Sequence, residues 1–377
     1  MDNKHIWDLF KNNHKIEVGK TLGKGGFGEV KEIKMNGKIY AAKLVKINAK
    51  KDTEKGSFDE GEEKDNIILY LKNSNIVKIY KIYQEIDNSN KNEGYNLIIM
   101  ERAVLKDLKT FIKYLFSNNR ENIICQPYNE NIGNHFLIFL AKQIIKGLET
   151  FERNELIHFD IKPENILIFL EISLKLSDFG LLREVYNLEK IRIPGGTPGY
   201  LSPDYYKYRG HRIPVRNAKK QDYFALGASL YLLKYGERMI KHKIHKSKKK
   251  TEENTLNLEY IVEMIPKIII KIKSDLVADR DFVNFLCSLI QIEAEDRPNF
   301  EEIYRNKWVN KNADYISKIT KCFGNDEQKL IKELRKSDYL YEKTQELSKI
   351  KRRKFVFKIN NKKINNKTVF KRNNILK

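Results

Sequence analysis

Short apolar runs separated by turn residues predict a small β-sheet in the first part of the chain. Five runs rich in β-branched and aromatic residues are typical of strands: 16–18, 29–33, 39–43, 76–83 and 95–100. The pair Asn36 and Gly37 between the second and third runs is a strong signal for a two-residue hairpin turn. A helical pattern with Ile67, Ile68 and Leu71 interrupts the strands. We therefore expect a small sheet with one helix.

The periodicity changes to 3.6 residues after Asp107, which predicts a second, helical part. One face of a buried helix is marked by Phe136, Leu140, Ile144, Ile145 and Leu148. Strand-like segments return between 156 and 176, and helical patterns dominate from Asp222 onward. No repeat of 20 to 50 residues is visible, which excludes solenoids and propellers. The 377 residues suit two lobes or domains.

Charge changes this picture only locally. The chain has 72 Lys and Arg against 50 Asp and Glu, a net charge of +22. Residues 349–377 carry 12 basic residues and residues 241–250 carry six Lys, with no acid in either stretch. In the rest of the chain, the positive and negative charges nearly balance. We expect a solvated basic tail at 349–377, or one that serves nuclear import or docks an acidic partner or nucleic acid. The insert at 241–250 is expected to be a surface loop, or to attract acidic substrates.

The three cysteines, Cys125, Cys287 and Cys322, are far apart and form no C-x-x-C pair. This spacing argues against a disulfide framework and against a zinc site. The start of the chain lacks a signal peptide, and its most apolar run, 166–176, contains Glu171 and Lys175. We expect an intracellular protein, cytoplasmic or nuclear, without membrane insertion.

A glycine-rich segment lies between the first two predicted strands. Gly23, Gly25, Gly28 and Val30 fit G-x-G-x-x-G-x-V, in which backbone N–H groups can close over phosphate oxygens. The same glycines would suit a Rossmann turn or a flexible hairpin, but a Rossmann turn leads into a helix and these lead into a strand. A lid over ATP fits better. Lys43 at the end of the third run would contact the phosphates, unless it is a solvated strand lysine.

Further motifs follow in the second part. The string His-Phe-Asp-Ile-Lys-Pro-Glu-Asn occupies 158–165, Asp-Phe-Gly occupies 178–180, and Gly-Thr-Pro-Gly-Tyr at 196–200 precedes Ser-Pro-Asp at 202–204. In this order and spacing, the motifs resemble those of the eukaryotic Ser/Thr protein kinase family over residues 16–308. Phe159 stands where the family's catalytic loop has Arg.

The resemblance implies an α+β, two-lobed protein kinase fold, with a small β-rich N-lobe and a larger helical C-lobe. We expect an N-terminal extension at 1–14 and a kinase domain at 15–310, divided into an N-lobe of about 15–102 and a C-lobe of about 103–310. A C-terminal extension at 311–377 would end in the basic tail.

The resemblance also implies an ATP-dependent kinase that transfers phosphate to Ser or Thr hydroxyls of a protein. Asp160 would be the catalytic base, and Lys162 would contact the γ-phosphate. Thr197 supports the Ser/Thr preference. Asn165 and Asp178 would hold Mg²⁺. The residues expected around ATP are Leu22, Gly23, Gly25, Gly26, Gly28, Val30, Ala41, Lys43, Met100, Glu101, Ala103, Asp107, Asn165 and Asp178.

Some of these positions have a second interpretation or a structural role. Asp107 would approach the ribose or simply begin a helix. His158 is expected to pack beneath Phe179, and Asp222 to brace the catalytic loop. Arg297 would pair with Asp204, where the family has Glu, and the shorter side chain predicts a looser pair.

The glutamate that should pair with Lys43 is out of place. Counting nine residues back from the segment Asn-Ser-Asn-Ile-Val at 73–77 gives Lys64. Glu60, Glu62 and Glu63 are close by, and we choose Glu63 as the catalytic partner because it is in register with the apolar helix positions. If no acid reaches Lys43, the chain is a pseudokinase scaffold that binds nucleotide or partner proteins.

The activation segment also departs from the family. Between Gly180 and Gly196 there is no Ser or Thr, and Tyr186 is the only hydroxyl. In relatives, an Arg before the catalytic Asp adds positive charge, and a phosphate on the activation loop neutralises it. Phe159 carries no charge, so no phosphate is needed for this purpose. We therefore expect a kinase that does not depend on activation-loop phosphorylation.

Overall fold

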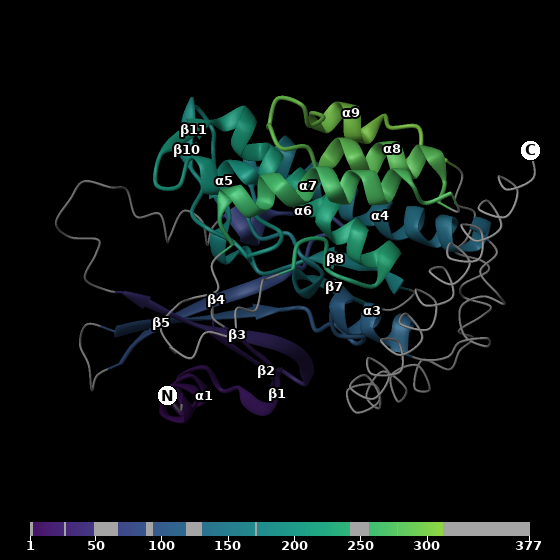
Figure 1. Ribbon diagram of the computed structural model, residues 1–377. Helices are drawn as coiled ribbons and strands as arrows, with labels where there is room; N and C mark the ends of the chain where they lie inside the picture. The colour runs from purple at the N-terminus through teal and green to yellow at the C-terminus, as the bar shows by residue number, and fades with distance from the viewer. Residues whose placement is uncertain are drawn as a thin grey trace, which may run out of the picture.

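Two lobes, one built on a sheet and the other on helices, make up the structure (Figure 1). The computed structural model describes residues 3–25, 28–48, 67–87, 93–117, 130–169, 172–241, 256–276 and 278–311. The predicted two-lobed α+β fold is confirmed. The basic tail at 349–377, nearly all of the lysine-rich insert, and Glu60, Glu62 and Glu63 lie outside the described residues.

The N-lobe sheet is antiparallel, with strand order β1-β2-β3-β5-β4. Its strands are β1 (Glu17–Gly25), β2 (Gly28–Met35), β3 (Lys38–Asn48), β4 (Ile79–Ile86) and β5 (Glu93–Met100). The β2–β3 turn has positive φ at Asn36 and Gly37, 50° and 75°. Two left-handed residues are what the predicted two-residue hairpin needs. A helical turn at 67–70 follows the helical pattern there.

Helix α1 (Lys4–His14) covers the face of the sheet that points away from the C-lobe (Figure 1). Its buried residues Ile6, Trp7 and Phe10 form one face, at the spacing of an amphipathic helix. They pack in the same cluster as Leu44 of β3. Side chains alternate along a strand, so Lys43 points to the opposite face, toward the C-lobe.

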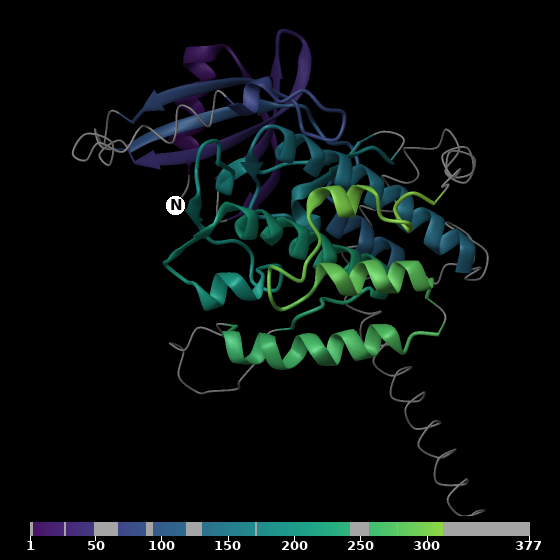
Figure 2. The same ribbon diagram turned by 90° about the horizontal axis from the view of Figure 1, so that it is seen from above.

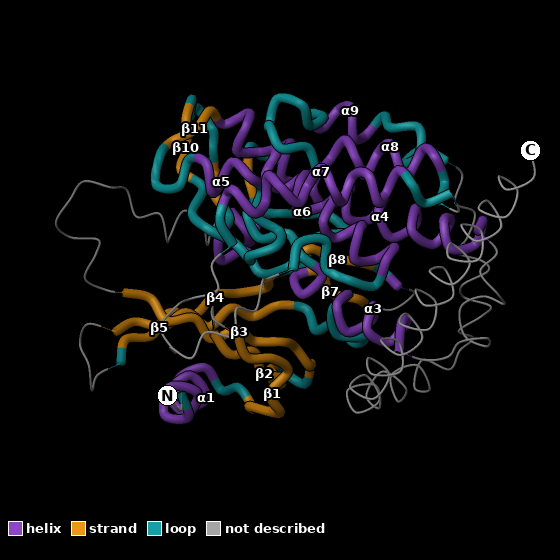
Figure 3. The backbone as a smooth tube through the Cα atoms, in the orientation of Figure 1, coloured by secondary structure: helices purple, strands orange, loops and turns teal. Residues whose placement is uncertain are grey.

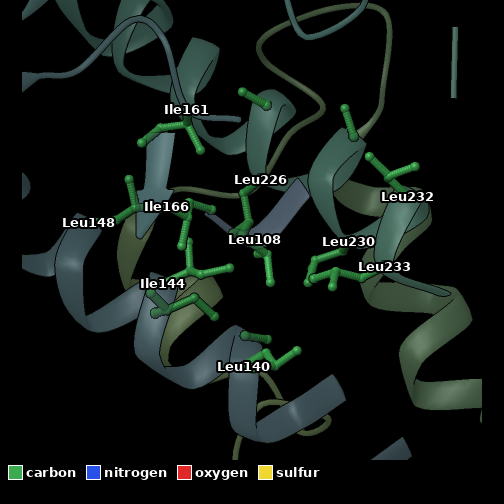
Figure 4. Close-up of a cluster of buried hydrophobic side chains, with 14 of the residues drawn as sticks. Leu108, Leu140, Ile144, Leu148, Ile161, Ile166, Leu226, Leu230, Leu232 and Leu233 are labelled. Carbon is green, nitrogen blue, oxygen red and sulfur yellow. The ribbon is translucent and has the colours of Figure 1, made fainter. Parts of the chain in front are cut away.

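The C-lobe packs around α6 (Val215–Tyr235), most of whose residues are buried. In Figure 4, Leu226 and Leu230 of this helix lie among Leu140 and Ile144 of α4 in one apolar cluster. The other helices are α3 (Leu108–Ser117), α4 (Glu130–Arg153), α5 (Pro203–Lys207), α7 (Leu258–Lys273), α8 (Arg280–Leu289) and α9 (Phe300–Tyr304). Seen from above, the sheet and α1 lie at one end of the molecule and α7 at the other (Figure 2). Within the described ranges, every helix is too short or too polar to cross a membrane.

Short strand pairs shape the loops of the C-lobe (Figure 3). They are β6 (Leu156–Ile157) with β9 (Arg183–Glu184), β7 (Ile166–Ile168) with β8 (Leu174–Leu176), and β10 (Lys190–Arg192) with β11 (Arg212–Pro214). Two 3₁₀ turns, Pro163–Asn165 and Phe179–Leu181, carry the ends of two sequence motifs.

The lobes are joined by backbone hydrogen bonds between the segment at 75–77 and β8. Val77 N donates to Leu176 O at 2.9 Å, and Leu176 N donates to Asn75 O at 2.9 Å. The buried Asn75 side chain adds a bond to Leu174 O at 2.8 Å. We call this connection, in which residues 75–77 form three hydrogen bonds with β8, the strap. It fixes the N-lobe beside the strand that leads into Asp178.

Candidate active site

The glycine-rich hairpin leaves its backbone open on one side. A Cβ on Gly28, whose φ is +129°, would lie 2.0 Å from the carbonyl oxygen of Leu44, so only glycine fits there. A Cβ on Gly23 or Gly25 would meet nothing within 4 Å. This open space can take phosphate oxygens close to the backbone. Gly26 lies outside the described residues.

Two cavities of about 680 and 500 Å³ lie between the lobes and share Lys43, Met100 and Asp178 in their walls. Their sizes are those of small-molecule sites. Of the predicted ATP-contact residues, the described ones all line one cavity or both: Leu22, Gly23, Gly25, Gly28, Val30, Ala41, Lys43, Met100, Glu101, Ala103, Asp107, Asn165 and Asp178. The residues expected around ATP therefore lie around the space between the lobes, and their contact with ATP stays a prediction.

Part of the lining of the larger cavity suits a flat aromatic base. Val30, Ala41 and Met100 line it with apolar surface, together with Leu167, which the sequence analysis did not single out. Leu167 is an apolar residue two positions after Asn165, and that position could have signalled it. In the described part of the chain, the backbone N–H of Ala103 donates to no other group. Apolar lining together with an open backbone donor fits adenine.

Asp107 lies where a helix begins and also at the wall of the larger cavity. It lines the larger cavity and also precedes α3, where its Oδ1 accepts a hydrogen bond from Thr110 N at 2.8 Å. Burial raises the pKa of the Asp107 carboxyl, and the bonds from Thr110 oppose this rise. Helix capping therefore fixes a carboxylate at the cavity wall.

Lys43 and Asp178 form the ion pair that joins the two cavities. Lys43 Nζ lies 2.5 Å from Asp178 Oδ1, and Lys43 is buried. Burial by itself raises the pKa of Asp178, but the Lys43 ammonium more than reverses this, so the pKa lies below its usual value. Asp178 is therefore ionised at neutral pH. Glu63, the predicted partner of Lys43, is outside the described residues.

Asp160 is held by three side chains and is itself buried. Its Oδ2 accepts hydrogen bonds from Lys162 Nζ at 2.6 Å and from Asn165 Nδ2 at 2.9 Å. Its Oδ1 accepts from Thr197 Oγ1 at 2.7 Å, and Lys162 Nζ also donates to Thr197 Oγ1 at 2.6 Å. The carboxylate is thus fixed in one orientation by charge-assisted hydrogen bonds. Asp160, Lys162 and Asn165 lie in one sequence motif and Thr197 in another, and the structure brings the four together.

Asn165 and Asp178 offer oxygen atoms suited to a hard cation. Asn165 uses its Nδ2 for bonds to Asp160, which leaves Oδ1 as an acceptor. Both residues line the larger cavity. In the described ranges, no group of three or more His, Cys, Asp or Glu gathers as a metal site. Two protein oxygens at the wall of this cavity fit Mg²⁺, which keeps waters and phosphate oxygens as its other ligands.

His158 and Asp222 support the loop from beneath. His158 is fully buried, its Nε2 lies 3.0 Å from Ser177 O, and its ring packs edge-on against Phe179 at 5.8 Å. Burial lowers the pKa of His158, so the ring is neutral. Asp222 accepts hydrogen bonds from the backbone N–H groups of His158 at 2.7 Å and Phe159 at 2.9 Å. Both placements agree with the sequence analysis.

The buried pair of Arg297 and Asp204 corrects one expectation. Arg297 Nη2 contacts Asp204 Oδ2 closely, and both side chains are almost fully buried. The looser pair predicted from the shorter aspartate is wrong. Arg297 also donates to three carbonyls, those of Lys220, Gln291 and Ile292, which hold its guanidinium in place.

Phe159 fills an apolar cluster under the activation segment, which we call the Phe159 cluster. Its members are Ile157, Phe159, Val185, Ile191, Ile193, Ile213 and Ala218. Phe159 is 1% exposed. The cluster was not predicted, because its members come from four separate stretches of chain. The alternate spacing of Ile157 with Phe159 and of Ile191 with Ile193 was the signal that the sequence carried.

Comparison with known proteins places this geometry in a family. Residues 16–309 match the protein kinase domain. The chain is 27% identical over 307 residues to the serine/threonine-protein kinase stk11 homolog of Dictyostelium discoideum, covering 80% of this chain and 46% of that protein. It is 30% identical over 242 residues to serine/threonine-protein kinase cds1 of Schizosaccharomyces pombe, covering 61% and 48%.

A third relative, NUAK family SNF1-like kinase 1 of Homo sapiens, is 30% identical over 226 residues, which is 59% of this chain and 30% of that protein. The matched region is therefore less than half the length of these relatives. The family match alone covers more than three quarters of this chain. With the cleft between two lobes and the motifs in order around it, this chain belongs to the protein kinase domain family.

Proposed function

We propose that the protein is an ATP-dependent protein kinase that transfers the γ-phosphoryl group to Ser or Thr hydroxyls of protein substrates. The observation that carries this proposal is the fixed carboxylate of Asp160, bonded to Lys162, Asn165 and Thr197 beside the cavity that contains Lys43 and Asp178. Phosphoryl transfer needs positioning and charge stabilisation more than covalent help, and this arrangement supplies both.

In the proposed reaction, Asp160 orients the acceptor hydroxyl and takes its proton as the new bond from oxygen to the γ-phosphorus forms. The bond from the γ-phosphorus to the β-bridging oxygen breaks, and ADP leaves. Lys162 offers positive charge to the γ-phosphoryl oxygens and Lys43 to the α- and β-phosphates. Mg²⁺, held by Asn165 and Asp178, would neutralise charge on the phosphates.

We further propose that activity does not require phosphate on the activation segment. A phosphate usually orders this segment by pairing with Arg. Here Phe159 occupies the Arg position, and Ile191 and Ile193 of the segment are buried with it. Apolar burial can hold the segment without a phosphate, because it needs no charge to be neutralised.

The test compares wild type with Asp160→Asn after phosphatase treatment. Phosphate transfer from Mg-ATP to generic proteins and to the chain itself is followed with labelled ATP. We expect transfer to Ser and Thr by the dephosphorylated wild type, and a fall of at least about 10²-fold in the variant, as is usual when a catalytic base is removed. A matched control, Asp8→Asn on the exposed side of α1, should keep full activity. A large loss of wild-type activity after phosphatase treatment would contradict independence from phosphorylation.

A second candidate, a scaffold that binds nucleotide or partner proteins, is favoured by one observation. Lys64 occupies the position where the family has the glutamate that pairs with Lys43. The same experiment separates the two, because a scaffold would bind an ATP analogue in calorimetry while both wild type and Asp160→Asn transfer no phosphate.

A further inference from the structure

The activation segment contributes one strand to a two-stranded basic ribbon, β10 with β11. The strands pair antiparallel, with Arg192 directly opposite Arg212 and Lys190 opposite Pro214. Lys190, Arg192 and Arg212 are all exposed. Because side chains alternate along a strand, Lys190 and Arg192 stand on the same face of the ribbon. The ribbon therefore presents two arginines and a lysine together on its outer face.

This arrangement is unfavourable unless an anion covers it. Side chains directly opposite in an antiparallel pair have Cβ atoms about 5 Å apart, and like charges there repel. Within the described part of the chain, none of the three bases forms an ion pair. Glu189, the acid next to the ribbon, bonds to other described residues only through its backbone carbonyl, which accepts from Val215 N. From residue 205 to residue 221 the sequence has six Lys and Arg and no Asp or Glu.

The other face of the ribbon is firmly anchored. Ile191 and Ile213, opposite each other in the pairing, are both buried in the Phe159 cluster. The arginines thus project from a backbone that is already ordered, so binding a ligand costs entropy in their side chains but not in the ribbon backbone. Arginine's planar fork matches the oxygens of a phosphate, and two arginines side by side can hold one dianion.

The ribbon lies within reach of the proposed transfer site. Arg192 is five residues before Thr197, whose hydroxyl bonds to Asp160. Five residues span at most about 17 Å of extended chain. A substrate with its acceptor hydroxyl at Asp160 could therefore place a residue no more than about five positions away on the ribbon. Figure 1 shows β10 and β11 together at the edge of the C-lobe beside α5.

We propose that the basic ribbon of Lys190, Arg192 and Arg212 binds a phosphoserine or phosphothreonine of the protein substrate, so that the enzyme favours substrates that are already phosphorylated near the acceptor. This inference rests on the proposed kinase function and names the substrate class for it. The phosphate would lie between the two arginines and replace their mutual repulsion with charge-assisted hydrogen bonds.

The test uses synthetic peptides with one Ser acceptor and one phosphoserine, which is moved from five residues before the acceptor to five residues after it. For wild type, kcat/KM should be at least about tenfold higher at one or two positions than for the unphosphorylated peptide. In the double variant Arg192→Gln with Arg212→Gln, kcat/KM for that phosphopeptide should fall to the unphosphorylated value, while the value for the unphosphorylated peptide stays unchanged. The control double variant Arg280→Gln with Arg305→Gln removes two basic residues elsewhere on the C-lobe and should behave as wild type.

A binding measurement separates the ribbon from catalysis. The best phosphopeptide, with its acceptor changed to Ala, is labelled, and its binding is followed by fluorescence anisotropy with and without 50 mM inorganic phosphate as competitor. Binding that is lost in the Arg192 and Arg212 double variant supports the ribbon site even if no peptide is phosphorylated. The melting temperature of the variant should be no lower than that of wild type, because both side chains are exposed and their mutual repulsion is removed.

Three results would overturn the proposal. The first is equal binding of phosphorylated and unphosphorylated peptides by wild type. The second is an unchanged preference in the double variant. The third is tighter binding of a single-stranded oligonucleotide than of the phosphopeptide, lost in the same variant, which would make the ribbon a nucleic-acid surface.

Discussion

At the scale of single residues, Asp178 depends on Lys43 for its charge state. Burial favours the protonated carboxyl, and the ammonium at 2.5 Å overrides it. In wild type, the folded pKa lies below the unfolded one, so this carboxyl stabilises the fold above the unfolded pKa and loses that contribution as pH falls through the folded pKa. Lys43→Met removes the ammonium and its hydrogen bond, so burial, the largest cause, is opposed only by weaker contacts such as the hydrogen bond from Gly180 N. The folded pKa should therefore rise above the unfolded one.

The expected result is a reversed pH dependence. In Lys43→Met, the contribution of Asp178 should be present at low pH and lost as pH rises through the raised pKa. Urea unfolding of both proteins between pH 4 and 8 gives the difference in the free energy of unfolding at each pH. The control Lys78→Met removes an exposed lysine at the lobe junction and should follow wild type. Parallel curves for wild type and Lys43→Met would refute the coupling.

The buried ring of Phe159 packs in one cluster with Ile191 and Ile193 of the activation segment. Phe159→Ala should lower the free energy of unfolding by about 3–5 kcal/mol, the usual cost of a large cavity in a core. Ile191 and Ile193 lose packing at the same time, so phosphate transfer should fall and protease cleavage of the activation segment should rise. Tyr186→Phe, at the exposed and only hydroxyl between Gly180 and Gly196, should change neither. Unchanged proteolysis in Phe159→Ala would show that the cluster does not hold the segment.

Residues within one continuous string could be assigned from the sequence, since neighbours in the chain stay neighbours in space. Asp160, Lys162 and Asn165 are examples, and the structure adds Thr197 to them through hydrogen bonds. The Phe159 cluster and the pairing of Arg192 with Arg212 could not be assigned, because both join stretches whose contact depends on how the activation segment folds back.

Among the helices and strands, local sequence patterns predicted where an element lies, but they did not predict what it packs against. The hairpin at Asn36 and Gly37 has a turn chemistry of its own, so its position followed from two residues. Helix α1 was treated only as part of an extension, although Ile6, Trp7 and Phe10 already had helical spacing. A short amphipathic helix is marginal by itself, and its stability comes from the sheet face that it covers.

Trp7 is the residue through which α1 should contribute most. It is 2% exposed, its Nε1 donates to Glu29 Oε2 at 2.9 Å, and Glu29 directly follows Gly28 of the glycine-rich hairpin. Trp7→Ala should lower the free energy of unfolding by about 3–5 kcal/mol, measured in urea. Trp7→Phe keeps most of the bulk and should cost much less. Asn12→Ala, on the exposed side of α1, should leave the free energy of unfolding unchanged. If Asn12→Ala lowers it as much as Trp7→Ala does, the contribution of α1 does not come from its buried face.

At the scale of the whole molecule, the strap between the lobes is reinforced by one ion pair. Lys175 Nζ of β8 lies 2.8 and 2.7 Å from the two carboxylate oxygens of Glu101, which also accepts from Lys78 N. Glu101 and Ala103 form one wall of the larger cavity, whereas Lys175 lines neither cavity. Lys175 therefore holds Glu101, a residue of that wall, from outside both cavities.

Lys175→Ala leaves the half-buried Glu101 carboxylate with one hydrogen bond, which costs about 1–3 kcal/mol. Part of this cost should appear as a shift of the cavity wall, so the Kd for a non-hydrolysable ATP analogue should rise about three- to tenfold in calorimetry. Lys146→Ala, an exposed lysine on α4, should leave the Kd unchanged. If Lys175→Ala lowers stability while the Kd stays within twofold of wild type, the pair fastens the lobes together but does not align the nucleotide site. If both the stability and the Kd change, the nucleotide site depends on a contact outside the cavities. The reason is that the Glu101 carboxylate belongs to the cavity wall and also bonds to Lys175 and Lys78 at the junction of the lobes.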